Sequence, residues 1–423
     1  MAKTYDTYKD SGSVWVGDIP SEWNIGNFRY FGEFTKGKLP STTNTEGKGL
    51  PIIGASEMLG KECRTFSEDA NVPQCSNDDI LILWDGANAG IISSHHKGIV
   101  SSTAVKYHCS NSDVNKNFLY YFLKSVEPNF KEKVNGTTIP HMNMKYINEI
   151  PLLMPPLSVQ QSISSFLDTK CGEIDSLISI QEEMISELLA YKQSVITEAV
   201  TKGLDKKAKM KNSGVEWIGD IPEEWEVIKI QYLNQGLTDG THGTYNRVDK
   251  GRLLLSSKNV REKDLLITDS ESQISEEDYQ SIISNGFPKK GDLLMCCIGA
   301  SIGRCIIYKY DETYAFQRSV IFIRCNKLIK PELLRYNLLS NNSLLQELFL
   351  INQSAQAGLY QGQVKEIKVI VPPISKQKQI IDYLDEKTSQ IDSLIALKQS
   401  KIESLKEYKK SIIYEYVTGK KRV

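Results

Sequence analysis

Histidine and cysteine are the residues whose spacing would reveal a metal site or a reactive nucleophile. The chain has five histidines and eight cysteines. His95 and His96 are neighbours, and neighbouring residues on a strand point to opposite faces, so they do not converge on one ion. The cysteines form no C-x-x-C pair, so we expect reduced thiols in a cytosolic protein and no zinc site. Each histidine is expected on the surface or in a loop.

Motifs that hold nucleotides or perform methyl transfer are also missing. The Gly-Lys pairs at 37–38, 47–48 and 419–420 are each followed by the wrong residue for a phosphate-cradling GxxxxGK[ST] loop. Neither Pro-Pro pair is preceded by Asn or Asp, so the four-residue signature of amino-methyltransferases is absent. The chain is therefore predicted not to be a catalyst. A nuclease or methyltransferase of unknown type stays open only if the purified chain cuts or modifies DNA by itself.

Composition describes an ordinary globular protein with several folding units. The 423 residues are 40% hydrophobic and 24% charged, which favours two to four folding units. No run approaches eighteen apolar residues, and the first twelve residues lack an apolar core, so we expect neither a membrane span nor a secretory signal. The formal net charge is −1, whereas proteins that coat DNA are strongly basic. DNA binding would therefore need local patches, or charge supplied by a partner.

The chain is an internal repeat. SGSVWVGDIPSEW at 11–23 returns as SGVEWIGDIPEEW at 213–225. IPLLMPPLSVQQSISSFLDTKCGEIDSLI at 150–178 aligns with IKVIVPPISKQKQIIDYLDEKTSQIDSLI at 367–395, and YKQSVITEAVTKG at 191–203 aligns with YKKSIIYEYVTGK at 408–420. Each half is thus a variable segment followed by a better-matched one. The recurrent tryptophan element is expected to clamp the entry to each domain by burial.

The better-matched segments predict two long helices. Each follows a Pro-Pro pair, lacks proline for over forty residues and carries apolar residues at heptad-like spacing. A helix over about 159–201 would be ~65 Å long, too long to bury its own apolar stripe, so we expect the two helices to pack antiparallel about a pseudo-twofold axis. The alternative is a local helical hairpin in each half, broken at Gly172. The residues predicted to pair the helices are Ile174, Leu177, Leu188, Tyr191, Ile391, Leu394, Leu405 and Tyr408.

The variable segments, 24–150 and 226–367, read as mixed, β-rich domains in which short apolar runs alternate with turn residues. DILILWDGANAG at 79–90 aligns with DLLMCCIGASIG at 292–303. Two interpretations of the shared glycines stay open. They supply positive φ in a structural turn, or they let the backbone approach a ligand.

This order of segments resembles the specificity subunit of type I restriction–modification systems. The resemblance covers the whole chain and is carried by the helical repeats with PP-x-x-x-Q at Gln160 and Gln377, by SGVEWIGDIPEEWEV, and by TDGTHGTYNRVDKGRLLLSSKNV at 238–260. It implies an α+β fold with two target-recognition domains at opposite ends of two long antiparallel helices. The implied divisions are a first recognition domain (1–154), a first helix (155–201), a linker (202–212), a second recognition domain (213–371) and a second helix (372–423).

The resemblance also implies function. Each recognition domain reads one half of a bipartite, asymmetric double-stranded DNA target, and the helices act as a ruler and bind two methyltransferase subunits. Restriction/translocase subunits join the complex. The chain itself binds no cofactor and no membrane, and S-adenosylmethionine, ATP and Mg²⁺ belong to the partner subunits. A coiled-coil adaptor with two β-rich protein-binding modules is the alternative; salt-sensitive, sequence-dependent DNA binding by the reconstituted complex distinguishes the two.

Residues that read bases must be polar and lie near turns in the variable domains. Arg or Lys can bridge guanine O6 and N7, and Gln or Asn can pair with adenine. About half of such residues are expected to contact phosphates or solvent instead. We predict that Gln317 and Arg318, which open a strand aligned with Ser102 and Thr103, touch DNA. The remaining candidates are Lys36, Lys38, Ser41, Thr42, Asn88, Thr241, His242, Lys258 and Asn259.

Overall fold

The structure is a computed structural model that describes residues 4–132, 141, 142, 147, 150–351 and 358–423. It divides into two compact units, Met1–Glu182 with Gln399–Val423, and Glu183–Lys398. These bounds differ from the predicted domains, because each long helix is divided between the units instead of forming a domain of its own.

The first unit is built on two four-stranded sheets and two strand pairs. Its sheets have the strand orders β4-β11-β8-β9 and β6-β5-β10-β7. The first sheet is antiparallel throughout, and the second contains the parallel pair β5 and β10. The elements are β1 (Tyr8–Asp10), β2 (Asp18–Pro20), β3 (Asn24–Asn27), η1 (Phe28–Tyr30), β4 (Gly32–Lys36), β5 (Leu50–Ile53), α1 (Ala55–Met58), β6 (Phe66–Ser67), β7 (Gln74–Cys75), β8 (Ile80–Leu83), β9 (Ile92–Ser94), β10 (Gly98–Val100), β11 (Ala104–Cys109), α2 (Lys116–Glu132) and β12 (Pro151–Met154).

The second unit repeats this topology. Its main sheet has the order β16-β22-β19-β20, and the smaller one, β18-β17-β21, contains the parallel pair β17 and β21. The elements are β13 (Met210–Asn212), β14 (Asp220–Pro222), β15 (Glu226–Lys229), η2 (Ile230–Tyr232), β16 (Asn234–Asp239), β17 (Arg252–Leu255), β18 (Gln273–Ile274), α5 (Glu276–Ile283), β19 (Leu293–Cys296), η3 (Gly299–Ser301), β20 (Cys305–Ile307), β21 (Ala315–Phe316), β22 (Val320–Cys325), α6 (Pro331–Leu338), α7 (Asn341–Leu350), α8 (Gln361–Glu366) and β23 (Lys368–Val371).

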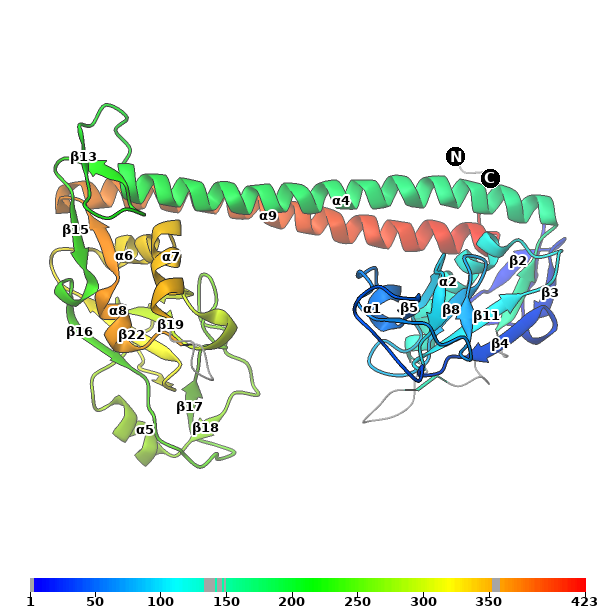
Figure 1. Ribbon diagram of the computed structural model, residues 1–423, viewed down its shortest axis with the longest axis horizontal. Helices are drawn as coiled ribbons and strands as arrows, with labels where there is room; N and C mark the ends of the chain where they lie inside the picture. Colours follow the sequence, from blue (N-terminus) through cyan, green and yellow to red (C-terminus); the bar gives the residue numbers. More distant parts are fainter. Residues whose placement is uncertain (1–3, 133–140, 143–146, 148–149, 352–357) are drawn as a thin grey trace. The chain divides into compact units, whose positions relative to one another are not determined.

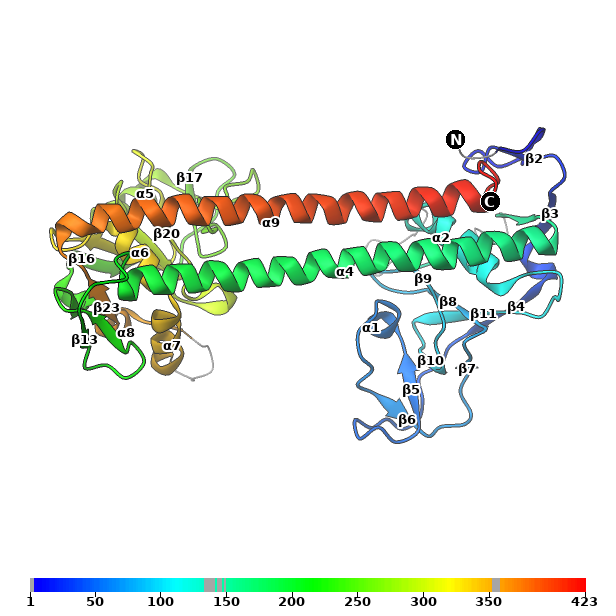
Figure 2. The same ribbon diagram turned by 90° about the horizontal axis from the view of Figure 1, so that it is seen from above.

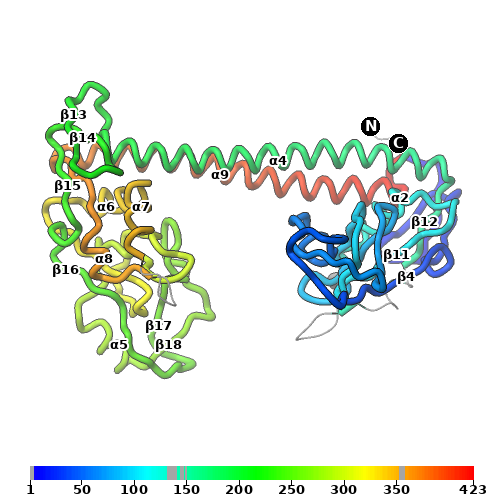
Figure 3. The backbone as a smooth tube through the Cα atoms, in the orientation of Figure 1, coloured from blue at the N-terminus to red at the C-terminus, as the bar shows by residue number. Residues whose placement is uncertain are grey.

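Apart from β7, which has no counterpart among the described strands of the second unit, the two units share one strand arrangement. This confirms the repeat found in the sequence and the predicted α+β fold. The hairpin β1–β2 corresponds to β13–β14, and the pair β3–β12 corresponds to β15–β23. β13 lies inside the predicted linker, so the end of that segment is a paired strand. Figure 3 shows the chain passing from the long helix into this hairpin, drawn in green.

The two long helices are α4 (Leu157–Lys202) and α9 (Ile374–Val417), and they run side by side (Figures 1 and 2). In the first unit, the tilted rings of Phe166 and Tyr416 have centroids 4.5 Å apart, and the Lys409 Nζ lies 2.7 Å from the Asp175 Oδ2. Because α4 numbering rises while α9 numbering falls, the helices are antiparallel. α4 is continuous through Gly172, so the local-hairpin alternative is wrong.

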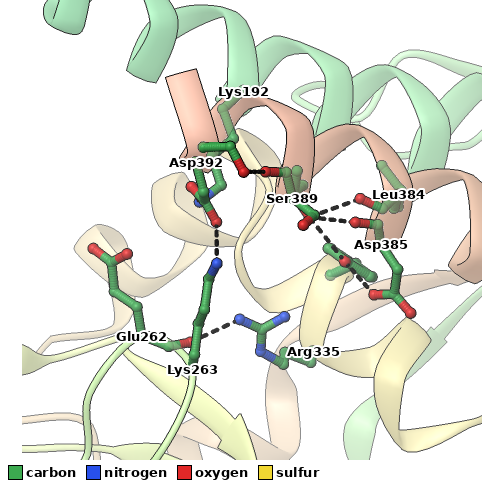
Figure 4. A network of polar contacts seen from close by, with 11 residues as sticks. Lys192, Glu262, Lys263, Arg335, Leu384, Asp385, Ser389 and Asp392 are labelled. Atoms are coloured by element: carbon green, nitrogen blue, oxygen red, sulfur yellow. Dashed lines mark hydrogen bonds and ion pairs between the residues drawn. The ribbon is translucent and has the colours of Figure 1, made fainter. Parts of the chain in front are cut away.

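The inter-helix ion pair is also repeated. In the second unit, Lys192 Nζ lies 2.7 Å from Asp392 Oδ1, and these residues occupy the positions of Lys409 and Asp175 in the duplicated segments. Lys263, from the loop after β17, lies 2.9 Å from the other oxygen of Asp392 (Figure 4). Burial alone would raise the pKa of Asp392, but these two lysines outweigh it and hold the pKa below its usual value.

The helix seam corrects part of the predicted pairing set. Buried or half-buried residues recur at alternating steps of four and three from Leu167 to Ala199 and from Leu384 to Ile412. Ile174 and Ile391 are 4% exposed and lie in the seam, as predicted, and Leu188 and Leu405 are half-buried there. The other four predicted residues point to solvent: Leu177, Tyr191, Leu394 and Tyr408 are 44%, 57%, 47% and 57% exposed.

The misplacement has a physical cause. Each exposed residue precedes a true seam residue by one position, and in two of the four cases that seam residue is a lysine, Lys192 or Lys409. Their aliphatic stems pack in the seam while their ammonium groups reach the facing Asp. A search for apolar residues passes over such positions and selects the tyrosine beside them.

Each long helix is joined to its own β-rich domain by the same contacts. Gln160, 1% exposed, accepts a hydrogen bond from the Asn115 backbone N–H at 2.8 Å and donates to the carbonyls of Asp113 and Pro155. Gln377 makes the equivalent three bonds, to Lys330, Leu328 and Pro372. The glutamine of PP-x-x-x-Q is therefore a buried structural residue in both halves.

Burial of the tryptophan element holds for its second tryptophan, which packs at the end of a long helix, whereas Trp217, a first tryptophan, is 42% exposed. Trp23 is fully buried, and a Cβ added to Gly419, just after α9, would lie 3.1 Å from its ring. Trp225 is 6% exposed, and a Cβ added to Gly203, just after α4, would lie 2.9 Å from its ring. Both glycines have positive φ, so a side chain there would be strained as well as crowded.

Candidate nucleic-acid interface

In each unit, the segment after the first strand of the main sheet crosses the turn that leads into the central strand. Gly37, after β4, donates a hydrogen bond to the Ala104 carbonyl, and the Lys38 N–H donates to the Val100 carbonyl. In the second unit, Gly240 and Thr241 donate to the equivalent carbonyls of Val320 and Phe316. The crossing is the same backbone structure in both units.

Only glycine fits at this crossing. A Cβ on Gly37 would lie 2.1 Å from the Ser101 carbonyl oxygen, and one on Gly240 would lie 2.3 Å from that of Gln317. Real Cβ atoms do not approach backbone oxygens so closely, and a turn of backbone cannot give way as a flexible side chain can. The two crossing segments are thus fixed against each other at one glycine.

Side chains around the crossing differ between the units although the backbone is the same. Lys36 and Lys38 flank Gly37, whereas Asp239 and Thr241 flank Gly240. The alignment of Gln317 and Arg318 with Ser102 and Thr103, made from the sequence, is shifted by one residue. By the hydrogen bonds, Gln317 is equivalent to Ser101 and Arg318 is equivalent to Ser102. Gln317 and Arg318 lie in the turn before β22 and do not open that strand.

In the second unit, the predicted residues Thr241, His242, Gln317 and Arg318 gather at the crossing. Thr241 forms an isolated bridge with Gln317, and its carbonyl accepts a hydrogen bond from the Arg318 backbone N–H at 3.0 Å. The Arg318 side chain is exposed and Gln317 is half-buried. His242 Nε2 lies 2.8 Å from Asp239 Oδ2. A cation and an amide therefore stand side by side on one turn.

Sequence reasoning missed two polar groups there. The Gln361 amide, at the start of α8, donates to the Asp239 Oδ1 at 2.6 Å, and the Tyr245 hydroxyl lies 2.6 Å from the Thr241 hydroxyl. Gln361 is distant in sequence, and only the fold brings it to the crossing. Tyr245 lies within the segment 238–260, which was singled out as a whole without weighing its tyrosine.

Lys258 and Asn259 lie on a loop after β17 and differ in accessibility. The Lys258 ammonium is 2.8 Å from Glu271 Oε2 and holds the pKa of that carboxyl below its usual value. Asn259 is 1% exposed; its amide oxygen accepts from the Ser256 N–H and its amide nitrogen donates to the Leu266 carbonyl. Asn259 corrects our prediction, since a base-reading residue must present its amide at the surface.

In the first unit, the predicted residues are spread more widely. Lys36 Nζ lies 3.2 Å from Asp85 Oδ2, whose other oxygen meets His141 Nδ1 at 2.7 Å. Lys38 is exposed beside the crossing, and Ser102 and Thr103 form its facing turn, half-buried. Ser41, Thr42 and Asn88 are exposed on loops. Ser41 donates from its backbone N–H and its hydroxyl to Asp69, which lowers the pKa of that carboxyl.

The family is decided by comparison with known proteins. The model of the family described as "Type I restriction modification DNA specificity domain" matches residues 20–189 and 219–407. The chain belongs to this family. The two matched segments coincide with the two halves of the repeat, so each half carries one copy of the family's domain.

Relatives cover nearly the whole chain. The type I restriction enzyme MjaVIII specificity subunit of Methanocaldococcus jannaschii is 29% identical over 414 residues, which span 96% of this chain and 94% of the relative. The EcoBI specificity subunit of Escherichia coli is 23% identical over 372 residues, 84% of this chain and 76% of its own. A solved chain from work on complex assembly and conformational transition of the type I R-M system has a TM-score of 0.68 at 14% identity, covering 94% and 98% of the two chains; it shows the same fold.

The glycines shared by the aligned 79–90 and 292–303 segments fit the structural interpretation. Gly86, Gly90, Gly299 and Gly303 all have positive φ, between 77° and 97°. These values place them in turns that L side chains rarely adopt. Backbone geometry therefore accounts for glycine at these four positions of the chain.

The described part of the chain was also searched for reactive cysteines, metal sites and membrane-spanning helices. All eight cysteines are free thiols, and burial raises the pKa of Cys297 to about 12, so it is not an activated nucleophile at neutral pH. Among the residues described, no three His, Cys, Asp or Glu side chains converge to hold a metal ion. Within the same residues, no helix has the length and apolar character needed to cross a membrane.

Proposed function

We propose that this family member reads a bipartite, asymmetric double-stranded DNA target, with one half-site for each unit. One observation carries the proposal. The backbone crossing at Gly37 and Gly240 is duplicated, while the side chains around it differ at almost every position. A fixed scaffold that presents different polar groups in its two copies suits two different sequences joined in one target.

The side chains at the crossings suit base recognition. Arg318, Lys36 and Lys38 carry the donors that bridge guanine O6 and N7, and Gln317 carries the amide that pairs with adenine N6 and N7. Serine and threonine hydroxyls at the first crossing can donate hydrogen bonds to base edges or accept hydrogen bonds from them. Some of these groups are expected to contact phosphates, which position the protein without reading sequence.

Replacing Gln317 and Arg318 by alanine tests base reading. We expect relaxed specificity in one half-site only, with a loss of ~1–3 kcal/mol per bidentate contact. The measurement is the methylated motif, obtained by long-read sequencing of cells that carry the variant complex. The matched control replaces Ser101 and Ser102, at the equivalent positions, and should affect only the other half-site.

Two results would contradict the proposal. An unchanged motif at full methylation removes Gln317 and Arg318 as readers. Equal loss at both half-sites from either double variant would show that the crossings do not act separately. Binding of the reconstituted complex to target DNA should also weaken steeply with salt; salt-insensitive binding would favour the adaptor alternative.

We further propose that the helix pair binds two methyltransferase subunits. Six of the exposed apolar residues on it form two equivalent sets: Leu177, Ile180 and Tyr408 in the first unit, and Leu394, Leu397 and Tyr191 in the second. Each set is a leucine and a tyrosine with one further aliphatic residue, 44–67% exposed. Exposed apolar groups at repeated positions suit two copies of one protein partner.

Catalysis in this proposal belongs to the partners. S-adenosylmethionine is expected in the methyltransferase subunits, and ATP and Mg²⁺ in the restriction/translocase subunits, which would complete the complex. The near-neutral charge of this chain is then explained, because the methyltransferases supply part of the positive surface around the DNA.

A further inference from the structure

Helix α7 (Asn341–Leu350) is amphipathic in the reverse sense. Its polar residues Asn342, Ser343, Gln346 and Glu347 are buried, between 2% and 9% exposed. Four of its five apolar residues face solvent: Leu344, Leu345, Leu348 and Phe349 are 37%, 44%, 68% and 82% exposed. We call these four residues the α7 patch. A surface helix ordinarily buries its apolar stripe, so this orientation indicates a partner on the outer face.

The polar face is held inward by specific contacts. Gln346 accepts from the Lys368 backbone N–H at 2.9 Å and donates to the Lys368 carbonyl at 2.9 Å, so it pairs with β23 as a strand would. Glu347 lies against Gly303, whose added Cβ would be 2.5 Å from the carboxylate oxygen. These contacts fix which side of α7 faces out.

The α7 patch suits a protein and not DNA. The only charged side chain of α7 is Glu347, which is buried, so the helix presents no cation to phosphates. DNA backbones are bound chiefly by Lys and Arg, whereas uncharged apolar and aromatic clusters mark protein interfaces.

The patch continues onto a long helix. Leu344 of α7 and Leu189 of α4, which is 52% exposed, line the same hollow of about 640 Å³ in the second unit. Beside this hollow, α4 forms hydrogen bonds with the chain at the start of α7. The Gln193 amide donates to the Leu339 carbonyl, and the Asn341 N–H donates to the Thr197 hydroxyl. One body seated on α4 can therefore also cover α7.

We propose that the α7 patch binds the methyltransferase subunit that serves the second half-site. This inference rests on the proposed function. An enzyme that modifies a base must hold that base, extruded from the duplex, in its own active site. A methyltransferase acting on the half-site read by the second unit must therefore lie against that unit itself, and not only on the helix pair. The α7 patch is an apolar surface of that unit that suits this contact.

The long-helix part of this surface differs between the halves. At the position equivalent to Leu189, α9 carries Lys406, so the long-helix part of the surface is not repeated. The two methyltransferase copies are therefore expected to be held by different contacts.

The test replaces Leu348 and Phe349 by serine in the full chain and titrates the cognate methyltransferase subunit by native mass spectrometry. We expect the wild-type chain to bind two copies, and the L348S/F349S variant to bind one copy unchanged and the other at least about tenfold more weakly. Methylation of the second half-site should fall while that of the first is kept. The matched control, Tyr232→Ser with Leu266→Ser, removes side chains 64% and 47% exposed in the same unit and should bind as wild type.

A photo-crosslinking residue at position 349 identifies the occupant directly. An adduct with the methyltransferase supports the inference. An adduct with DNA, with a restriction/translocase subunit or with a second copy of this chain overturns it, as does unchanged two-site binding by L348S/F349S. If the wild-type chain binds no methyltransferase at all, the proposed function fails instead, which is a different result from the loss of one site.

Discussion

Gln160 and Gln377 illustrate how a single residue joins the two kinds of structure in this chain. Each amide makes three hydrogen bonds across the start of a long helix, to a backbone N–H and two carbonyls of which at least one belongs to the β-rich domain. The glutamine recurs in the sequence because the same three backbone groups must be satisfied in both halves.

Gln160→Leu should lower the free energy of unfolding of the first unit. The leucine fills the space but leaves Asn115 N–H and two carbonyls without partners, each at ~1–3 kcal/mol when buried. We expect a loss of at least ~2 kcal/mol in urea denaturation. The neighbouring Gln161 is exposed, so Gln161→Leu is the matched control; an equal effect of both would show that the bonds of Gln160 contribute little.

Glu347 gives the second unit a pH dependence. Burial raises the pKa of its carboxyl from 4.5 to about 8. Between these values the folded chain keeps a proton that the unfolded chain has lost, so stability falls as pH rises, by at most ~1.4 kcal/mol per pH unit, and levels off above about pH 8.

Glu347→Gln removes this titration. The stability of the variant relative to the parent chain should therefore increase from pH 5 to pH 8, measured by urea denaturation at both values. Glu262→Gln, at an exposed carboxyl, should leave the pH profile as it is. A parallel profile for Glu347→Gln would show that the carboxyl is ionised in the folded chain.

At the residue scale, sequence could predict chemistry but not exposure. Polar residues near the turns after β4, β10, β16 and β21 were found because turn residues and strand ends are local patterns. Asn259 fits that pattern equally well, yet it turns inward to bond the Ser256 N–H and the Leu266 carbonyl. The one-residue error at Gln317 has a similar origin, because the crossing glycine that sets the register lies nearly eighty residues earlier.

At the scale of elements, the helix pair separates an inner seam from an outer face. Ile174 and Ile391 lie in the seam and are 4% exposed, while Leu177 and Leu394, three residues later, are 44% and 47% exposed. The sequence predicted two long antiparallel helices correctly, because apolar spacing without proline indicates a helix and a helix of that length needs a partner to bury its apolar stripe. The apolar periodicity could not separate the seam from the outer face, because the polar residues Gln181, Lys192 and Lys409 occupy seam positions.

Aspartate substitutions at these positions should have different effects. Ile174→Asp places an unpaired charge inside the seam and should destabilise the first unit by several kcal/mol, about 3–5 by the usual cost of a buried unpaired charge. Leu177→Asp should leave the thermal midpoint within a few degrees but abolish binding of one methyltransferase copy. Calorimetry and sizing chromatography with the methyltransferase distinguish the two. Failure of Leu177→Asp to change assembly would remove this face as the docking surface.

At the scale of the whole molecule, the helix pair is the proposed ruler between the two half-sites. The alternating steps of four and three make seven residues the natural unit of length, because a seven-residue insertion restores every seam position. It must be made in both helices, at Glu187 in α4 and at Leu397 in α9, which the Lys192–Asp392 pair places at the same level.

Such a double insertion should lengthen the unspecified spacer by about three base pairs, since seven residues add ~10.5 Å and each base pair spans ~3.4 Å. Both half-sites should be unchanged in the methylated motif. Insertion in α4 alone is the control and should break the pairing. An unaltered spacer in a complex that assembles with the double insertion would remove the ruler role.

The first unit combines residues up to 182 with residues 399–423, and the second is continuous from 183 to 398. During synthesis on the ribosome, the second unit can therefore be completed first, although most of the first unit emerges earlier. Until α9 arrives, Trp23, Ile163 and Leu167 lack the surface of Ile412, Ile413 and Val417 with which they share a core. The nascent chain thus carries an open apolar core through the translation of more than two hundred residues, and protection by a chaperone is most valuable in that interval.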